Sequence, residues 1–202
     1  MRTLIITVFA AAALLISACS DSDTTNTPTQ NGNLELKTYT ELHADTNSTK
    51  TPAYFSLSQN KMIDAADSQT TKWDLAFYAT SIYVNSGVRG PGHGGVVIQR
   101  NTTMDEITIA PETGYVTEDA YSPSAITGGS GNGWYNYVGP PTHAIVPIPG
   151  TVLIIRTADQ KYAKVRILNY YKGVPAQIDT SNIPRYYTFE YKYQPDGTRN
   201  LK

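Results

Sequence analysis

The three histidines are the first residues to consider as metal ligands or acid–base groups. His43, His93 and His143 are well separated and form neither an H-x-x-x-H nor an H-E-x-x-H pairing. No local motif therefore predicts metal chelation. His143 differs from the other two because its loop follows an aromatic segment at residues 134–138, where an imidazole could project into a cleft. We therefore take His143 as a candidate ligand residue.

Two glycine-rich segments resemble catalytic or nucleotide-binding motifs. Residues 90–95 satisfy G-x-G-x-x-G, but a dinucleotide site needs a helix N-terminus next, and the β-branched residues 96–98 predict a strand. We interpret the segment as a hairpin connection whose glycines supply positive φ. Residues 128–132 miss the G-x-S-x-G pattern because Asn132 occupies the position of the last glycine.

The carboxylates do not form an acid–base pair in the sequence. The adjacent acids at 105–106 and 118–119 point to different sides of an extended chain, and neither pair lies in an apolar run. Asp74 lies between a tryptophan and a leucine in a predicted strand. We predict that Asp74 is a buried acceptor for backbone donors. We therefore expect that this protein is not an enzyme.

The single cysteine, Cys19, indicates lipidation. Arg2 precedes an almost unbroken apolar stretch at residues 4–16, and small residues precede the thiol. About 13 apolar residues are too few to cross a bilayer as a helix, so the pattern is typical of a secretory signal. We predict a lipoprotein signal peptide at residues 1–18 and a lipid on Cys19, the only link to the membrane.

A polar tether follows the predicted lipid. Residues 19–33 form this segment, whose residues after the cysteine are too polar to offset the entropy of ordering them. Asp21 and Asp23 directly follow Cys19. Such acids act as a surface-export address in some bacterial groups, and they also suit a solvated tether. We expect an outer-membrane lipoprotein that is displayed on the cell surface.

The composition favours one β domain. Of 202 residues only 16% are charged, below the roughly 25% usual for soluble proteins, while 15 are tyrosine. The net charge of −1, with no basic patch, excludes binding to a phosphate backbone, so no nucleic-acid partner is expected. We place the folded domain at residues 34–202.

Hydrophobic residues with period two predict the strands that must position these side chains. Residues 186–193 place Tyr187, Phe189, Tyr191 and Tyr193 on one face. Residues 152–155 form an apolar run, predicted to be covered on both faces, and the short link 157–160 joins it to residues 163–167 in a hairpin. Other candidate strands lie at 54–57, 73–78, 81–85, 96–99 and 134–138. Residues 102–106 predict at most one or two helical turns, so the fold class is all-β, mostly antiparallel.

Several segments together resemble the HmuY family. They lie at residues 73–77, 82–87, 94–95, 104–105, 111–115, 152–165 and 185–194, in order along the domain. The resemblance implies a lipid-anchored, mostly β protein of Bacteroidetes-type bacteria. It also implies a hemophore-like role in iron acquisition, in which haem is captured outside the cell and passed to a TonB-dependent outer-membrane receptor.

The resemblance implies axial haem ligands in loops on either side of residues 134–138. The first stretch, 115–133, contains neither His nor Met, and the family's second ligand position aligns near Gly139. We predict that His143, four residues further on, binds the haem iron and that Tyr135 and Tyr137 line the pocket. Haem with one axial ligand, ligation by Tyr121, Tyr135 or Tyr137, and loss of haem binding remain open.

A second hypothesis is an interaction module of the same fold that has lost haem ligation. Such a module would bind another small ligand or an outer-membrane partner. The missing His and Met in residues 115–133 favour this alternative.

Overall fold

The computed structural model of the chain describes residues 33–44, 51–120 and 124–202. The predicted signal peptide, Cys19, most of the tether, and Tyr121 lie outside the described residues. Within the described ranges, no helix is long and apolar enough to span a membrane.

The larger sheet has five antiparallel strands, and it contains the predicted hairpin. Its order is β1 (Leu36–His43), β11 (Pro184–Gln194), β10 (Tyr162–Tyr171), β9 (Val152–Arg156) and β6 (Gly95–Gln99). The β9–β10 hairpin closes over the short link, with the last residue of β9 opposite the first residue of β10. The prediction of a hairpin between these two apolar segments is therefore confirmed.

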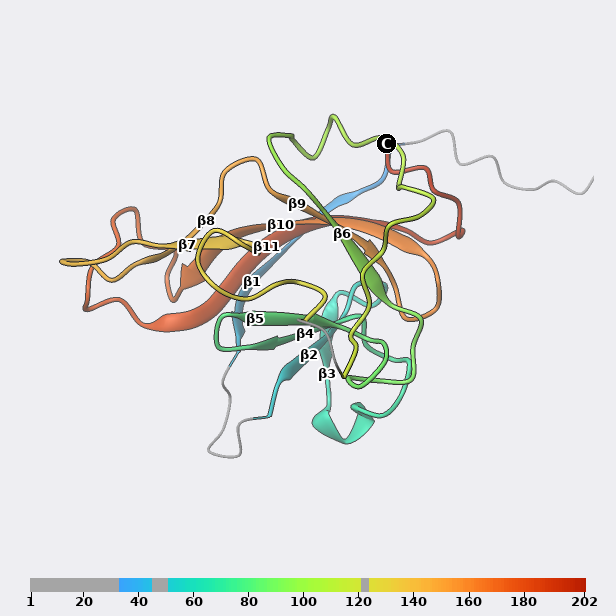
Figure 1. The fold of residues 1–202 in the computed structure, drawn as a ribbon, viewed down its shortest axis with the longest axis horizontal. Helices are drawn as coiled ribbons and strands as arrows, with labels where there is room; N and C mark the ends of the chain where they lie inside the picture. The colour runs from blue at the N-terminus through green and yellow to red at the C-terminus, as the bar shows by residue number, and fades with distance from the viewer. Residues whose placement is uncertain (1–32, 45–50, 121–123) are drawn as a thin grey trace, which may run out of the picture. The chain divides into compact units, whose positions relative to one another are not determined.

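A four-stranded sheet packs against the larger one (Figure 1). Its order is β3 (Lys61–Ile63), β2 (Ala53–Ser56), β4 (Leu75–Tyr78) and β5 (Ser81–Val84), again antiparallel. A short hairpin of β7 (Tyr135–Tyr137) and β8 (Ile145–Pro147) forms separately. Among the described residues the one helical element is η1 (Ala65–Asp67), so the all-β prediction is confirmed.

An aromatic core joins the two sheets. Tyr187, Phe189 and Tyr191 of β11 are fully buried, as the alternation of this strand predicted. The Phe189 ring lies 5.2 Å from the ring of Phe55 and 5.4 Å from that of Phe77, both in the smaller sheet. Aromatic side chains bury large areas and prefer such tilted or offset contacts, so these rings hold the two sheets together.

The opposite face of the larger sheet is covered by loops and chain ends. Val152 and Ile154 of β9 point into this second core and pack with Met104, Ile107 and Leu201. The prediction that this strand is covered on both faces is confirmed. No helix forms at residues 102–106, because these residues make only a turn.

The glycine-rich segment at 90–95 surrounds one asparagine. The backbone N–H of Gly92 donates to Asn85 Oδ1 at 2.9 Å, and a Cβ at Gly90 would lie 2.3 Å from that oxygen. Neither Gly90 nor Gly92 has a positive φ, so the prediction that these glycines supply positive φ was wrong. Glycine is required here because the backbone passes close to the Asn85 side chain. The strand β6 begins at Gly95, so no helix follows to hold a dinucleotide.

Asp74 is the buried acceptor that its sequence position predicted. Its carboxylate accepts hydrogen bonds from the backbone N–H groups of Leu57 at 2.8 Å and Ala158 at 3.1 Å. Leu57 follows β2, and Ala158 lies in the β9–β10 turn, so the carboxylate ties the two sheets together. Burial raises the pKa of Asp74 to about 6, although the two backbone hydrogen bonds oppose this shift.

Candidate functional site

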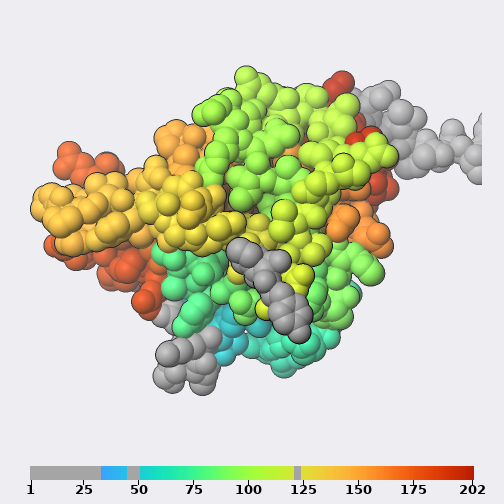
Figure 2. All heavy atoms as spheres, in the orientation of Figure 1, coloured from blue at the N-terminus to red at the C-terminus, as the bar shows by residue number. Residues whose placement is uncertain are grey.

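A cavity of about 350 Å³ lies where the β7–β8 loop meets the loop between β10 and β11. Figure 2 shows these two segments side by side, in yellow-orange and orange-red, at the left of the view. The lining residues are Thr142, His143, Ile145, Tyr170, Tyr171, Asp179, Thr180, Asn182, Pro184 and Arg185.

His143 is held in the cavity wall by an unusual backbone conformation. Its φ is +53°, in the left-handed region that residues other than glycine rarely adopt. The His143 N–H donates to the Gly139 carbonyl at 3.1 Å, and Val138 N–H donates to the Ala144 carbonyl at 2.7 Å. Such local strain persists only where surrounding contacts enforce it, and it is common in ligand-binding segments.

Tyr137 and His143, both predicted site residues, are brought together. The Tyr137 hydroxyl forms a hydrogen bond with His143 Nδ1. When Nδ1 donates its proton to the tyrosine oxygen, Nε2 keeps a free lone pair. Nε2 is then available to bind a metal, and the Tyr137 contact fixes the orientation of the ring.

Tyr135, the third predicted site residue, lies elsewhere. Its side chain is buried, its ring lies 4.9 Å from that of Trp134, and its hydroxyl is 3.4 Å from Thr80 Oγ1. Neither Tyr135 nor Tyr137 is among the residues that line the cavity. Tyr135 packs in the core, whereas Tyr137 acts on the cavity through its contact with His143.

The aromatic wall of the cavity comes from Tyr170 and Tyr171 at the end of β10. Sequence reasoning missed both residues because the alternating pattern of this strand ends near Ile167, before a register shift at Asn169. The feature of the sequence that could have indicated them is the pair of adjacent tyrosines after the alternating pattern ends. A register shift changes which face each side chain occupies, and here both rings reach the cavity.

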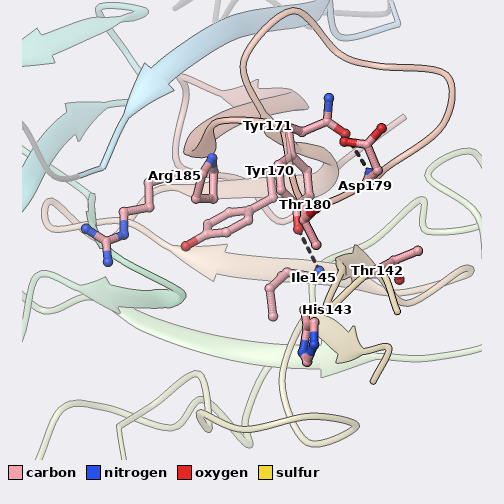
Figure 3. A pocket seen from close by; sticks show the side chains of 10 residues that line it. Thr142, His143, Ile145, Tyr170, Tyr171, Asp179, Thr180 and Arg185 are labelled. Carbon is pink, nitrogen blue, oxygen red and sulfur yellow. Dashed lines mark hydrogen bonds between the residues drawn. The ribbon is translucent and has the colours of Figure 1, made fainter. Parts of the chain in front are cut away.

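Tyr171 also fixes one edge of the cavity. The backbone N–H of Ile145 donates to the Tyr171 hydroxyl at 2.8 Å, which ties β8 to the end of β10 (Figure 3). Figure 3 shows Asp179 and Thr180 beside Tyr171, with His143 further away, beyond Ile145. Burial raises the pKa of Tyr170, so this phenol stays neutral in the physiological range.

Two charged side chains of opposite sign line the same cavity. Arg185 is the second residue of β11 and has a φ of +72°, and its carbonyl accepts the Ala44 N–H at 2.8 Å. The Asp179 carboxylate accepts hydrogen bonds from Ser181 N–H at 2.8 Å and Ser181 Oγ–H at 2.6 Å. These bonds lower the pKa of Asp179 and occupy the carboxylate within its own turn. Arg185, which interacts with Tyr170, supplies the one guanidinium group of the cavity lining.

The remaining candidates are outside this cavity. The His43 ring stacks on Tyr186 at 4.3 Å, and the His93 carbonyl accepts from Arg156 Nε at 2.9 Å. No three His, Cys, Asp or Glu side chains in the described ranges converge as a metal-ion site. The cavity lining thus contains one imidazole, two phenol rings, one guanidinium and one carboxylate.

The protein is an all-β domain with a loop-lined cavity at the end of its larger sheet. One histidine lies in the wall of this cavity. The profile of the HmuY protein family matches residues 48–191. The chain belongs to the HmuY family, as the order of its segments indicated. No curated protein sequence matches it.

Three solved structures share this fold. An HmuY-like haem-binding protein from Bacteroides vulgatus is 19% identical, with a TM-score of 0.51 over 78% of this chain and 91% of its own. The apo HmuY analogue of Tannerella forsythia is 16% identical, with a TM-score of 0.53 over 80% of this chain and 96% of its own. Apo PinO from Porphyromonas gingivitis is 16% identical, with a TM-score of 0.54 over 79% of this chain and 97% of its own.

Proposed function

We propose that this protein binds haem in the cavity beside His143 and carries it without chemical change. The observation that carries the proposal is a single imidazole in the cavity wall whose Nδ1 is already engaged by Tyr137. Membership of the HmuY family and the fold shared with a haem-binding protein from Bacteroides vulgatus support it. Haem would supply an iron with an open axial position, for which His143 Nε2 is a suitable ligand.

The residues present suit a flat, largely apolar macrocycle. Tyr170 and Tyr171 offer aromatic contact, and Arg185 can pair with a carboxylate at the edge of the ligand. The cavity volume of about 350 Å³ is at the lower end for small-molecule sites. The ligand would therefore extend over exposed apolar side chains of the same two loops, Val138 and Ile183.

A single protein ligand fits the composition of the site. The cavity lining contains no methionine and no histidine besides His143. An isolated metal ion would need more ligands than this, whereas a porphyrin supplies four nitrogens to its own iron. The same observation also suits an interaction module that binds a different small ligand, which is the alternative function.

We further propose the biological setting implied by the sequence. Cys19 would carry the lipid that anchors the protein to the outer membrane, and the polar tether would let the domain reach outward from the surface. Haem taken up there would pass to a TonB-dependent receptor.

Titration of the protein with haemin tests the proposal. We expect a saturable Soret band, and His143→Ala should shift that band and weaken binding. His93→Ala is the matched control because this exposed histidine is outside the cavity lining. Absence of a saturable band would contradict haem binding. A spectrum unchanged by His143→Ala would refute the ligand assignment alone.

A further inference from the structure

A second cavity, which we call the lysine cavity, lies at the other end of the β10–β11 pair. It has a volume of about 240 Å³ and is lined by Asn33, Asp105, Thr108, Lys164, Lys192 and Lys202. Lys164 precedes Tyr170 by six positions on β10, which corresponds to about 20 Å along a strand. The lysine cavity is therefore separate from the site beside His143.

Lys164 is the unusual member of this group because it is fully buried. Its Nζ donates to the carbonyls of Met104 at 2.5 Å and Ile107 at 2.8 Å. An ammonium group has three donors, so one N–H is left for another acceptor. A buried lysine is rarely left without a counter-charge. Burial and the nearby charge of Lys192 lower the pKa of Lys164 to about 8, which leaves it mostly charged at neutral pH.

The other two lysines increase the positive charge. Lys192 is directly opposite Lys164 in the register of β10 and β11, an arrangement in which like charges repel. Among the described residues, no ion pair neutralises Lys164, Lys192 or Lys202. Asp105 is the one side-chain carboxylate in the lining, so the ammonium groups of the lining side chains outnumber the carboxylates.

We propose that the lysine cavity binds a phosphate group, either as a free anion or as the headgroup of an anionic phospholipid. A phosphate carries about −1.5 to −2 charges at neutral pH, so the excess of positive side chains attracts it. Its oxygens can accept from ammonium groups and from the Thr108 hydroxyl and Asn33 amide.

Titration of the full chain with inorganic phosphate at physiological salt tests this proposal. Saturable NMR shifts at the Thr108 and Asn33 amides are expected. Lys192→Gln and Lys202→Gln should each weaken binding about tenfold, because each removes a charged donor. Lys61→Gln is the matched control, since Lys61 is an exposed lysine on β3 outside this cavity.

Vesicle binding distinguishes the two sources of phosphate. Preference for phosphatidylglycerol over phosphatidylcholine vesicles that is lost in Lys192→Gln but kept in Lys61→Gln indicates a lipid headgroup. Saturable phosphate binding without that preference indicates a free anion. The proposal is overturned if neither arm shows binding, or if Lys192→Gln and Lys61→Gln behave alike. Haemin binding by Lys192→Gln should equal that of the unmodified chain, so the two proposals fail independently.

Discussion

The buried carboxylate of Asp74 should make the stability of the domain depend on pH. Burial raises its pKa from the ordinary value of 3.8 to about 6. Between these values the folded state binds more protons than the unfolded state, so the free energy of unfolding falls as the pH rises. The shift corresponds to a decrease of about 3 kcal/mol in the free energy of unfolding, and this decrease is complete above about pH 6.

Replacement by asparagine separates the charge from the hydrogen bonds. Asp74→Asn keeps one acceptor oxygen, so one of the two backbone donors, Leu57 N–H or Ala158 N–H, loses its partner. That loss costs about 1–3 kcal/mol for a buried donor. The variant should therefore be less stable than the unmodified chain near pH 4. Because it carries no ionisable group at this position, the difference should shrink or reverse by pH 7.

Urea unfolding at several pH values between 4 and 7 measures this effect. Other carboxylates contribute equally to both proteins, so the difference between them isolates Asp74. Asp64→Asn is the control because it retains the Asp74 carboxylate. Its free energy of unfolding should change with pH as that of the unmodified chain does. A difference between Asp74→Asn and the unmodified chain that is constant from pH 4 to pH 7 would refute the reasoning.

Three further substitutions test the site and the core. Tyr137→Phe removes the partner of His143 Nδ1 and should weaken haemin binding about tenfold; equal affinity in the same titration would exclude an orienting role. Tyr171→Phe leaves Ile145 N–H without its acceptor and should lower the free energy of unfolding in urea by about 1 kcal/mol; an unchanged midpoint would count against this contact. Phe189→Ala opens a cavity between the two sheets and should cost about 3–5 kcal/mol in the same assay; a cost below 1 kcal/mol would contradict the described core.

The secondary structure was predictable wherever side chains alternate regularly. The buried row on β11 and the β9–β10 hairpin follow from the order of apolar residues, because a strand places positions i and i+2 on one face. The role of Asp74 was predictable for a similar reason, since a carboxylate between two buried neighbours must find donors. β1, β3 and β8 were not predicted, because their residues alternate weakly and depend on partners elsewhere in the chain.

The sequence by itself determined the fold class, the family and the candidate His143, because these depend on local pattern and on the order of segments. Tertiary structure alone decided what surrounds that histidine. Tyr170 and Tyr171 reach the cavity through a register shift, while Tyr135 turns into the core. The opposition of Lys164 and Lys192 likewise depends on strand register. Pairing between distant segments is set by packing of the whole sheet, which no local pattern encodes.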